Sequence, residues 1–306
     1  MLVTMRMSRD HEWMDLQQLR YVVEVAASSS FTRAAERCFV TQSALSHQIA
    51  ALEREIGQRL FVRSSRSVRL TEAGEAFVGP ARTAVLAAEQ AKEDASAAVG
   101  DVVGTLRLGV IPTVTAVDVP ELLVAYRSAH PSARVELQVG NSDALMADIR
   151  RGALDAALLG LREDVQPAGV ASRLLASEAL VAVAPSAHAL AQKASVRIRD
   201  LAGMTFADFP AGTSGRAQSD AAFAAAEAER DVAFEADSAE LILGLVEAGL
   251  AVTLLAPGVV ARSSADVTTV DVRRGPVRAE YVAWDAAAPR SVARAFLAVL
   301  ASHGRR

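Results

Sequence analysis

The sequence predicts an α/β protein that begins with a smaller head, built from helices and a two-stranded wing. Three patterns indicate this. Short amphipathic helices lead into a basic hairpin before residue 71, a long alanine-rich helix covers about 71–99, and strands alternate with helices from residue 105 onward. The chain has 306 residues, of which 51% are hydrophobic, so it is long enough for two or three domains with packed cores.

In the head, residues 42–56 form a helix with two distinct faces. An apolar stripe recurs at intervals of four, three and four residues: Leu45, Ile49, Leu52 and Ile56. A second stripe carries small hydrogen-bonding side chains: Gln42, Ser43, Ser46 and His47. Thr41 can cap this helix, and Ser30 can cap a preceding one that starts at Phe31. With a further helix over residues 15–27, the pattern predicts a helix-turn-helix.

The polar stripe favours DNA over a partner protein. It lacks the large apolar anchors of a helix that docks in a protein groove, and Gln, Ser and His can all bind base edges. Residues 57–70 add four arginines and no acid, with two short strands expected over 60–62 and 68–70. Such a hairpin is typical of a wing that contacts the DNA backbone or minor groove. The alternative is that the polar side chains only solvate an exposed helix.

Residues 14 to about 74 resemble the winged helix-turn-helix of LysR-type transcriptional regulators, and the resemblance continues more weakly through nearly all of the chain. The matching stretches are Leu19-Arg-Tyr-Val-Val, Phe31-Thr-Arg-Ala-Ala-Glu, Thr41-Gln-Ser-Ala-Leu-Ser, Gln48-Ile-Ala-Ala-Leu-Glu, Arg59-Leu-Phe-Val-Arg and Val68-Arg-Leu-Thr-Glu-Ala-Gly.

The resemblance implies a set of DNA-contacting residues. Gln42, Ser43, Ser46 and His47 on the helix and Arg63 and Arg66 in the wing would contact bases and phosphates. Thr32 and Arg33 would contact the DNA backbone. Family members often carry proline at the position of Ser43 and arginine at that of His47. The second departure bears on base preference, because histidine cannot make arginine's bidentate contact with guanine.

Charge is distributed unevenly along the chain. Residues 1–70 hold 10 arginines against 7 acids, a net +3, whereas the whole chain carries −4. A mildly basic head on an acidic body suits a protein that touches DNA with one end. The single cysteine, Cys38, excludes an internal disulfide and is expected to be a buried structural thiol. The five histidines show no metal-ligand spacing, so neither a metal nor a cofactor is expected.

The sequence also bears on location. It contains no run of 18 apolar residues, and its first 13 residues lack the apolar core of a signal peptide, so we expect no membrane span and a cytoplasmic protein. Met14 could be the native start.

Thr71 can cap the long helix, in which Pro80 should cause a kink or delay the start. One side of it carries Phe77 followed by a stripe of alanines: Ala81, Ala84, Ala88, Ala91, Ala95 and Ala98. We expect homodimerisation through this helix, as the resemblance also implies, with a single linker helix as the alternative. Residues 100–104 then form a hinge.

Beyond the hinge, strands are expected over 105–111, 134–139, 154–159, 179–184, 205–209, 232–236, 251–256, 268–272 and 277–285. Helices are expected over 119–129, 142–151, 215–229, 238–248 and 291–302, which predicts mostly parallel sheets covered by helices. By resemblance this is a two-lobed effector domain similar to periplasmic solute-binding proteins. Lobe I would comprise residues 104–164 and 265–306, and lobe II residues 165–264.

The cleft between the lobes should lie where strands end and helices begin. The candidate polar contacts there are Thr113, Asn141, Thr213 and Ser214, with Phe209 as an apolar wall and Arg216 as a partner for a carboxylate. Amide groups at helix starts favour an anion, so we expect a small acidic metabolite. The alternative is that these residues are ordinary helix caps.

The sequence therefore predicts a sequence-specific DNA-binding transcriptional regulator controlled by a small-molecule effector. Its expected partners are double-stranded operator DNA, the effector and further copies of itself (a dimer or a tetramer), with RNA polymerase as another candidate. An enzyme is not expected, because the chain has no Gly-x-Ser-x-Gly elbow, Walker loop or dinucleotide fingerprint. The rival classes are a solute-binding protein with a vestigial head and an enzyme on a two-lobed scaffold.

Overall fold

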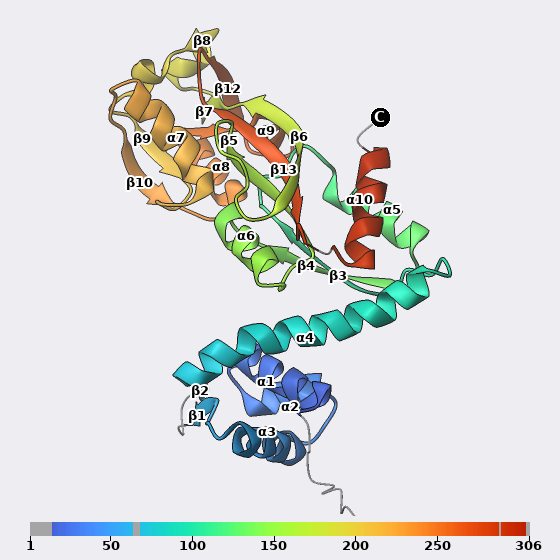
Figure 1. The fold of residues 1–306 in the computed structure, drawn as a ribbon. Helices are drawn as coiled ribbons and strands as arrows, with labels where there is room; N and C mark the ends of the chain where they lie inside the picture. The colour runs from blue at the N-terminus through green and yellow to red at the C-terminus, as the bar shows by residue number, and fades with distance from the viewer. Residues whose placement is uncertain (1–13, 64–67, 288, 304–306) are drawn as a thin grey trace, which may run out of the picture. The chain divides into compact units, whose positions relative to one another are not determined.

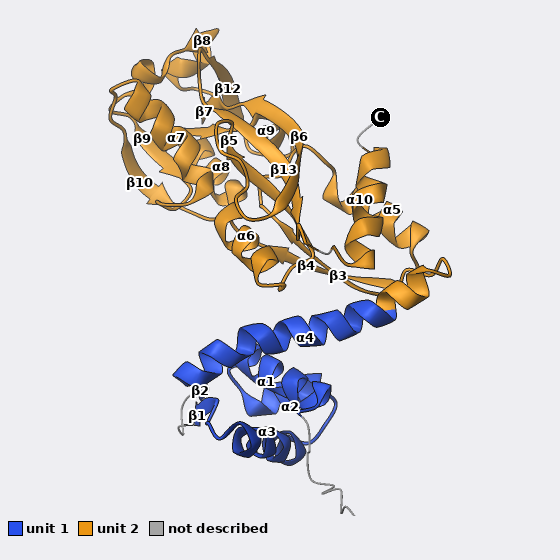
Figure 2. Cartoon of the chain, viewed as in Figure 1, with its two compact units in different colours: residues 1–92 blue, residues 93–306 orange. Residues whose placement is uncertain are grey.

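The computed structural model describes residues 14–63, 68–287 and 289–303. The chain forms two compact units, residues 1–92 and residues 93–306 (Figure 2). None of the described helices is long and apolar enough to cross a lipid bilayer.

The first unit is a helical head followed by a small hairpin (Figure 1). Its elements are α1 (Leu16–Ser28), α2 (Phe31–Arg37), α3 (Gln42–Ile56), β1 (Phe61–Arg63) and β2 (Val68–Leu70), the two strands being antiparallel. The side chains of Asp15, Ser30 and Thr41 each accept a hydrogen bond from an amide in the first turn of the helix that follows. Local capping therefore sets where all three helices begin.

The core of the head joins the three helices to the hairpin. Val22, Leu45 and Ile49 are fully buried there, and the rings of Phe31 and Phe61 meet edge to face at 5.6 Å. Glu53 Oε1 accepts hydrogen bonds from the amides of Leu60 (2.7 Å) and Phe61 (3.2 Å). The carboxylate thus fixes the path of the chain from α3 into the wing.

The long helix α4 (Glu72–Ala97) begins after Thr71 and continues through Pro80, so the proline does not delay its start. Within the first unit, Ala81 and Val85 of α4 are buried against Leu19 of α1. The later alanines Ala84, Ala91 and Ala95 are exposed. The alanine stripe is therefore only partly used for packing within the chain.

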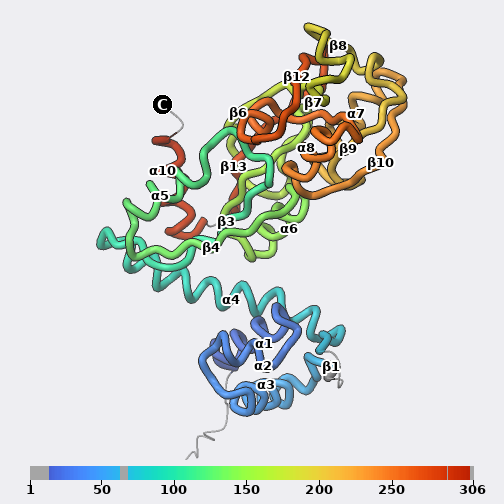
Figure 3. Tube along the Cα trace, turned by 180° about the vertical axis from the view of Figure 1, so that it is seen from behind, coloured from blue at the N-terminus to red at the C-terminus, as the bar shows by residue number. Residues whose placement is uncertain are grey.

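The second unit contains a five-stranded sheet in the order β4-β3-β5-β13-β6. Its strands are β3 (Gly104–Val110), β4 (Ala133–Val139), β5 (Ala156–Arg162), β6 (Ala171–Ala179) and β13 (Val277–Trp284). β3 is parallel to β4 and β5, whereas β13 is antiparallel to β5 and β6, so the sheet is mixed. Helices α5 (Val119–Ala129) and α10 (Ser291–His303) lie side by side in both views (Figures 1 and 3), while α6 (Ser142–Arg150) packs on β5 and β3.

A second sheet has the order β11-β7-β12-β8, and β9 pairs with β10 in parallel nearby. These strands are β7 (Val181–Pro185), β8 (Ser195–Val196), β9 (Thr205–Asp208), β10 (Asp231–Glu235), β11 (Thr253–Leu255) and β12 (Val267–Val272). Helices α7 (Ser214–Ala225), α8 (Ala239–Glu247) and α9 (Pro257–Ala261) and the short 3₁₀ turns η1 (Ala189–Gln192) and η2 (Ile198–Leu201) complete this half. Each sheet has its own apolar core.

The chain passes between the two sheets later than the sequence predicts. It leaves the first sheet at 179–181 and returns between 272 and 277, instead of near 165 and 265, because β6 pairs with β13 and β12 pairs with β7. β6 has no strand counterpart in the sequence prediction. Its residues are half-buried or exposed and do not alternate between apolar and polar, so the usual strand signal is missing.

The end of α4 is anchored within the second unit by a buried ionic cluster. Arg290 contacts both carboxylate oxygens of Glu93, and its Nη1 donates to Asp155 at 3.1 Å. All three residues are less than 9% exposed, so removing Arg290 would leave two buried carboxylates without a compensating charge.

Gly74 is the position in the head where a methyl group is least tolerated. A Cβ there would lie 2.1 Å from the carbonyl oxygen of Leu60, a backbone atom that cannot move aside. We expect Gly74→Ala to lower the free energy of unfolding by about 1–3 kcal/mol in urea titrations followed by circular dichroism.

Gly244→Ala is the matched control, because Gly244 lies in helix α8 and a Cβ there meets no atom within 4 Å. That variant should be neutral or more stable by up to about 1 kcal/mol. Equal effects at the two glycines would contradict the steric explanation.

Candidate DNA-binding face and ligand cavity

Helix α3 separates its two faces as the sequence predicts. Leu45, Ile49 and Leu52 are 0% exposed, and the structure leaves Gln42, Ser43 and His47 exposed, with Ser46 half-buried. Ile56 differs from the expectation: it is 37% exposed, because α3 ends there and Gly57 turns the chain away with a φ of 73°. The polar stripe therefore lies on the surface of the head, where it can meet a DNA groove.

Two hydrogen bonds organise the polar stripe. The Gln42 amide donates to Ser46 Oγ at 2.8 Å, one turn further along α3. The hydroxyl groups of Thr41 and Ser43 lie 3.1 Å apart. These contacts hold the side chains at the start of α3 in defined orientations, which lowers the entropy cost of binding a base edge.

The residues expected to contact the DNA backbone differ in their exposure and in their contacts within the head. Thr32 and Arg33 are exposed at the start of α2, but an Arg33 guanidinium N–H donates to the Ser28 carbonyl at 2.6 Å. Arg33 therefore also ties α2 to α1, and a phosphate would use its other donors. Arg66 lies outside the described residues, as does the side chain of Arg63.

Cys38 follows α2 and is half-buried rather than fully buried as expected. Burial, and next the charge of Glu24, raises the pKa of its thiol. At neutral pH the reactive thiolate is therefore scarce.

In the second unit, a cavity of about 270 Å³ lies between the two sheets. Four predicted residues line it: Thr113, Asn141, Phe209 and Thr213. The other lining residues are mostly apolar and come from both sheets: Ile111, Pro112, Val139, Gly140, Ser142, Gly160, Leu180, Pro210, Gly215, Gln218, Asp237, Leu254, Leu255, Ala256 and Arg278. The cavity thus lies where strands end and helices begin, as the sequence predicts.

Capping and lining coexist at two of these positions. The Asn141 side chain accepts from the Ala144 amide at 2.9 Å, and the Thr213 side chain accepts from the Arg216 amide at 3.4 Å. Each residue therefore serves as the cap that the alternative interpretation proposed, and each also borders the cavity.

Ser214 and Arg216 are placed differently from the expectation. Ser214 donates through its amide (3.0 Å) and its hydroxyl (2.6 Å) to Asp143, which joins the start of α7 to the start of α6. The guanidinium of Arg216 lies near three acids, Asp208, Asp220 and Glu235, and does not line the cavity. Three acids already surround the Arg216 guanidinium, so these contacts do not support its expected role as a partner for a ligand carboxylate, which stays a prediction.

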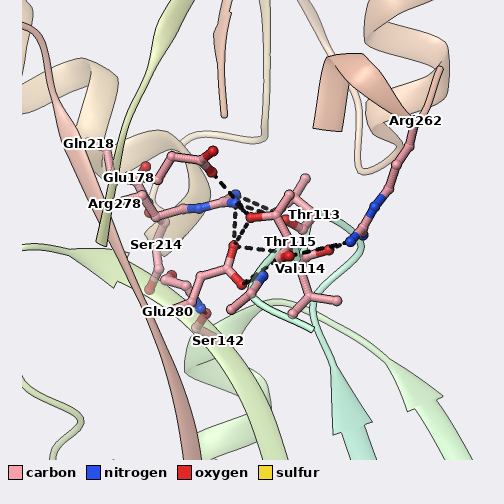
Figure 4. Close-up of polar contacts among 12 residues, drawn as sticks. Thr113, Val114, Thr115, Ser142, Glu178, Ser214, Gln218, Arg262, Arg278 and Glu280 are labelled. Atoms are coloured by element: carbon pink, nitrogen blue, oxygen red, sulfur yellow. Dashed lines mark hydrogen bonds and ion pairs between the residues drawn. The ribbon is translucent and has the colours of Figure 1, made fainter. Parts of the chain in front are cut away.

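Arg278, the positively charged residue of the described lining, was missed by the sequence prediction, together with Glu280. Both are buried in β13, two residues apart and hence on the same face of the strand (Figure 4). Arg278 Nη1 donates to Thr113 Oγ1 at 2.9 Å, and Glu280 accepts from the amides of Thr115 and Ala116. The sequence contains a clue to this pair, because Arg278 and Glu280 are two charged residues in an otherwise mostly apolar strand, and charged residues are rarely buried without a partner.

The same loop is held from the second sheet. Arg262, which follows α9, donates to the carbonyl oxygens of Val114 (2.6 Å) and Thr115 (3.3 Å), and Figure 4 shows it reaching the loop from the side opposite Arg278. Gly258 of α9 also packs closely, since a Cβ there would lie 2.8 Å from Thr115. Two polar contacts, Arg262 with the loop and Asp143 with Ser214, thus connect the halves around the cavity.

Comparison with family models matches nearly the whole chain. The model of the bacterial regulatory helix-turn-helix protein, lysR family, matches residues 16–75. The model of the LysR substrate binding domain matches residues 100–305.

Individual proteins are similar over most of their length. The hydrogen peroxide-inducible genes activator of Escherichia coli O157:H7 is 33% identical over 242 residues, 79% of each chain. A single-residue variant of full-length OxyR from Pseudomonas aeruginosa superposes with a TM-score of 0.76 at 29% identity, covering 96% of both chains. Full-length CbnR complexed with its target DNA superposes with a TM-score of 0.66 at 24% identity, covering 95% of this chain and 100% of that one.

Proposed function

This chain belongs to the LysR family of bacterial helix-turn-helix regulators, and we propose that it responds to a small organic acid bound in the cavity of residues 93–306. It is a DNA-binding transcriptional regulator with an effector-binding domain. The observation that carries the DNA side of this function is the exposed polar stripe of α3 opposite a fully buried apolar one.

On the DNA, α3 would lie in the major groove, where Gln42, Ser43, Ser46 and His47 contact base edges. Thr32, Arg33 and the wing arginines Arg63 and Arg66 would contact phosphates, which fixes the register without reading sequence. A dimer presents two such heads and would bind an inverted repeat with half-sites spaced by the helical turn.

The cavity supports an acidic effector. Thr113, Asn141 and Thr213 offer polar groups beside the starts of α6 and α7, where helix dipoles favour negative charge. Arg278 adds a positive charge to the lining, and Phe209 supplies an apolar wall. A volume of about 270 Å³ suits a small metabolite rather than a nucleotide or a peptide.

Control of DNA binding would follow from the two contacts that connect the halves around the cavity. An effector that contacts both sheets stabilises one arrangement over another by its difference in affinity for them. In a dimer, this shift would change the spacing or the orientation of the two α3 helices that bind DNA.

The alanine face of α4 provides a surface for that dimer, because small side chains allow two helices to approach closely. The assembly would be a homodimer or a homotetramer in the cytoplasm, acting at a promoter and therefore near RNA polymerase.

A sensor of peroxide is a second candidate, because one relative is named for that response. The sequence argues against it. Cys38 is the single cysteine of the chain and lies in the head, so residues 93–306 contain no thiol to oxidise.

Gln42→Ala should weaken binding to an operator selected from a random duplex pool by about ten- to a hundredfold, because a good base contact contributes about 1–3 kcal/mol. Gln48→Ala is the control, since Gln48 lies on the same helix but accepts a hydrogen bond from Gln18 of α1. Fluorescence anisotropy gives both affinities. If the two variants bind alike, the polar stripe is not the reading surface.

Arg262→Ala should loosen the connection between the two sheets. We expect a broader or shifted distance distribution between spin labels at Leu137→Cys and Leu241→Cys, two exposed sites, in a Cys38→Ser background. Arg173→Ala, at an exposed position in β6, serves as the control. An unchanged distribution for Arg262→Ala would show that this contact does not restrain the two halves.

Hydrogen peroxide should leave the operator affinity of the chain unchanged, and the titratable thiol count should remain one. Gel-shift titrations before and after treatment test this, with Cys38→Ser alongside. A peroxide response that Cys38→Ser abolishes would restore the thiol-sensor function.

A further inference from the structure

Arg278 is held by an ion pair and by uncharged acceptors, and one of its buried donors is left without a partner in the described part of the chain. Its Nη2 meets Glu280, while its other contacts end on uncharged oxygens: Thr113 Oγ1 at 2.9 Å, Thr113 O at 2.8 Å and Thr115 Oγ1 at 3.3 Å. Its Nε is buried and has no hydrogen-bond partner among the described residues. Arg278 is only 5% exposed, and a buried donor without a partner is costly.

The carboxylate that contacts Arg278 is shared with other donors. Glu280 accepts from the Thr115 amide at 2.9 Å, the Ala116 amide at 2.8 Å and Thr115 Oγ1 at 2.7 Å, in addition to Arg278. Burial lowers the pKa of the Arg278 guanidinium, against the opposing influence of the carboxylates of Glu280 and Glu178. Glu178 is a second acceptor for Thr115 Oγ1, at 3.2 Å, yet Arg278 Nε still lacks an acceptor among the described residues, which leaves a place for one more.

This buried guanidinium borders the cavity. The polar lining residues Thr113, Asn141 and Gln218 are uncharged, and the one acid in the described lining, Asp237, is exposed and follows β10. Gly160 allows the guanidinium to sit close to β5, because a Cβ there would lie 3.3 Å from Arg278 Cδ. Leu254, Leu255 and Phe209 form apolar walls around the remaining space.

We propose that Arg278 binds the carboxylate of the effector and that Glu280 is the internal carboxylate that competes for the Arg278 guanidinium. This proposal rests on the acidic effector proposed above. The ligand class is a small monocarboxylate with an apolar body. Arginine suits this role, because its planar fork pairs with both oxygens of a carboxylate. Among the described residues the lining offers one such positive charge, which disfavours dicarboxylates, since a second carboxylate would be buried without a partner.

The competition has a consequence for control. Glu280 fixes the amides of Thr115 and Ala116, and the carbonyl oxygens of the same loop hold Arg262 of the second sheet. A ligand carboxylate that draws Arg278 away from Glu280 changes the contacts of this loop. Ligand binding on one side of the loop is thereby coupled to the connection between the sheets on its other side.

The test uses hexanoate and benzoate as probes, each beside its neutral amide, with calorimetric titration of the full chain. For the wild type we expect the acids to bind and the amides to bind more weakly. Arg278→Gln should weaken acid binding by at least about tenfold, whereas Glu280→Gln should strengthen it, because the internal competitor loses its charge. A purely structural ion pair predicts no gain of affinity in Glu280→Gln.

Arg162→Gln is the matched control, since Arg162 lies directly opposite Arg278 on β5 and pairs with Asp164 at the surface. It should leave the affinity unchanged. The double variant Arg278→Gln/Glu280→Gln removes both charges together, so it avoids a buried unpaired carboxylate and should fold while still losing acid binding. Retained operator binding by each variant verifies the fold.

The outcomes separate the two proposals. If the acids bind the wild type and the Arg278 variants equally, Arg278 is not the anchor, and the acidic effector stands. If Glu280→Gln weakens acid binding, the competition is overturned. If the amides bind as well as the acids, or if neither acid binds the wild type, both the anchor and the acidic class of effector are overturned.

Discussion

The second unit depends on a pair of opposite charges buried in one strand, Arg278 and Glu280 of β13. Burying charges is unfavourable unless hydrogen bonds surround them, and here the loop of residues 113–116 supplies those bonds. The pair therefore dictates where this loop lies. Since the loop also receives Arg262 from the second sheet, one local requirement of electrostatics fixes the wall of the cavity and a connection between the halves.

In the head, one face of helix α3 is buried in the core and the opposite face is exposed to solvent. Leu45, Ile49 and Leu52 supply the burial that holds α3 in the three-helix core, so the opposite face is free of any structural duty except its own capping. The polar side chains there can then be chosen for recognition, and substitutions among them should alter operator preference with little effect on folding. A regulator family can in this way keep one head fold and vary what it reads.

Periodicity and capping made most of the fold predictable from the sequence, because both are local properties. The helices of the head, the long α4 and most strands of the second unit follow from them. Pairing between distant strands is not local, and so β6, which lacks alternation, was missed and the crossings between sheets were misplaced. The same limit applies to the site. Thr113, Asn141, Phe209 and Thr213 were found from strand ends, whereas the roles of Arg216 and Arg278 depend on which acids the fold brings near each guanidinium.

Binding in the cavity and binding to DNA are coupled in this account, and linkage requires the coupling to be reciprocal. The most direct measurement is the dissociation constant of one acid for the free chain and for the chain saturated with its operator. Two clearly different constants, matched by the change in operator affinity at saturating acid, are the predicted result. Identical constants would mean that the occupied cavity does not communicate with the head, and the account would be contradicted.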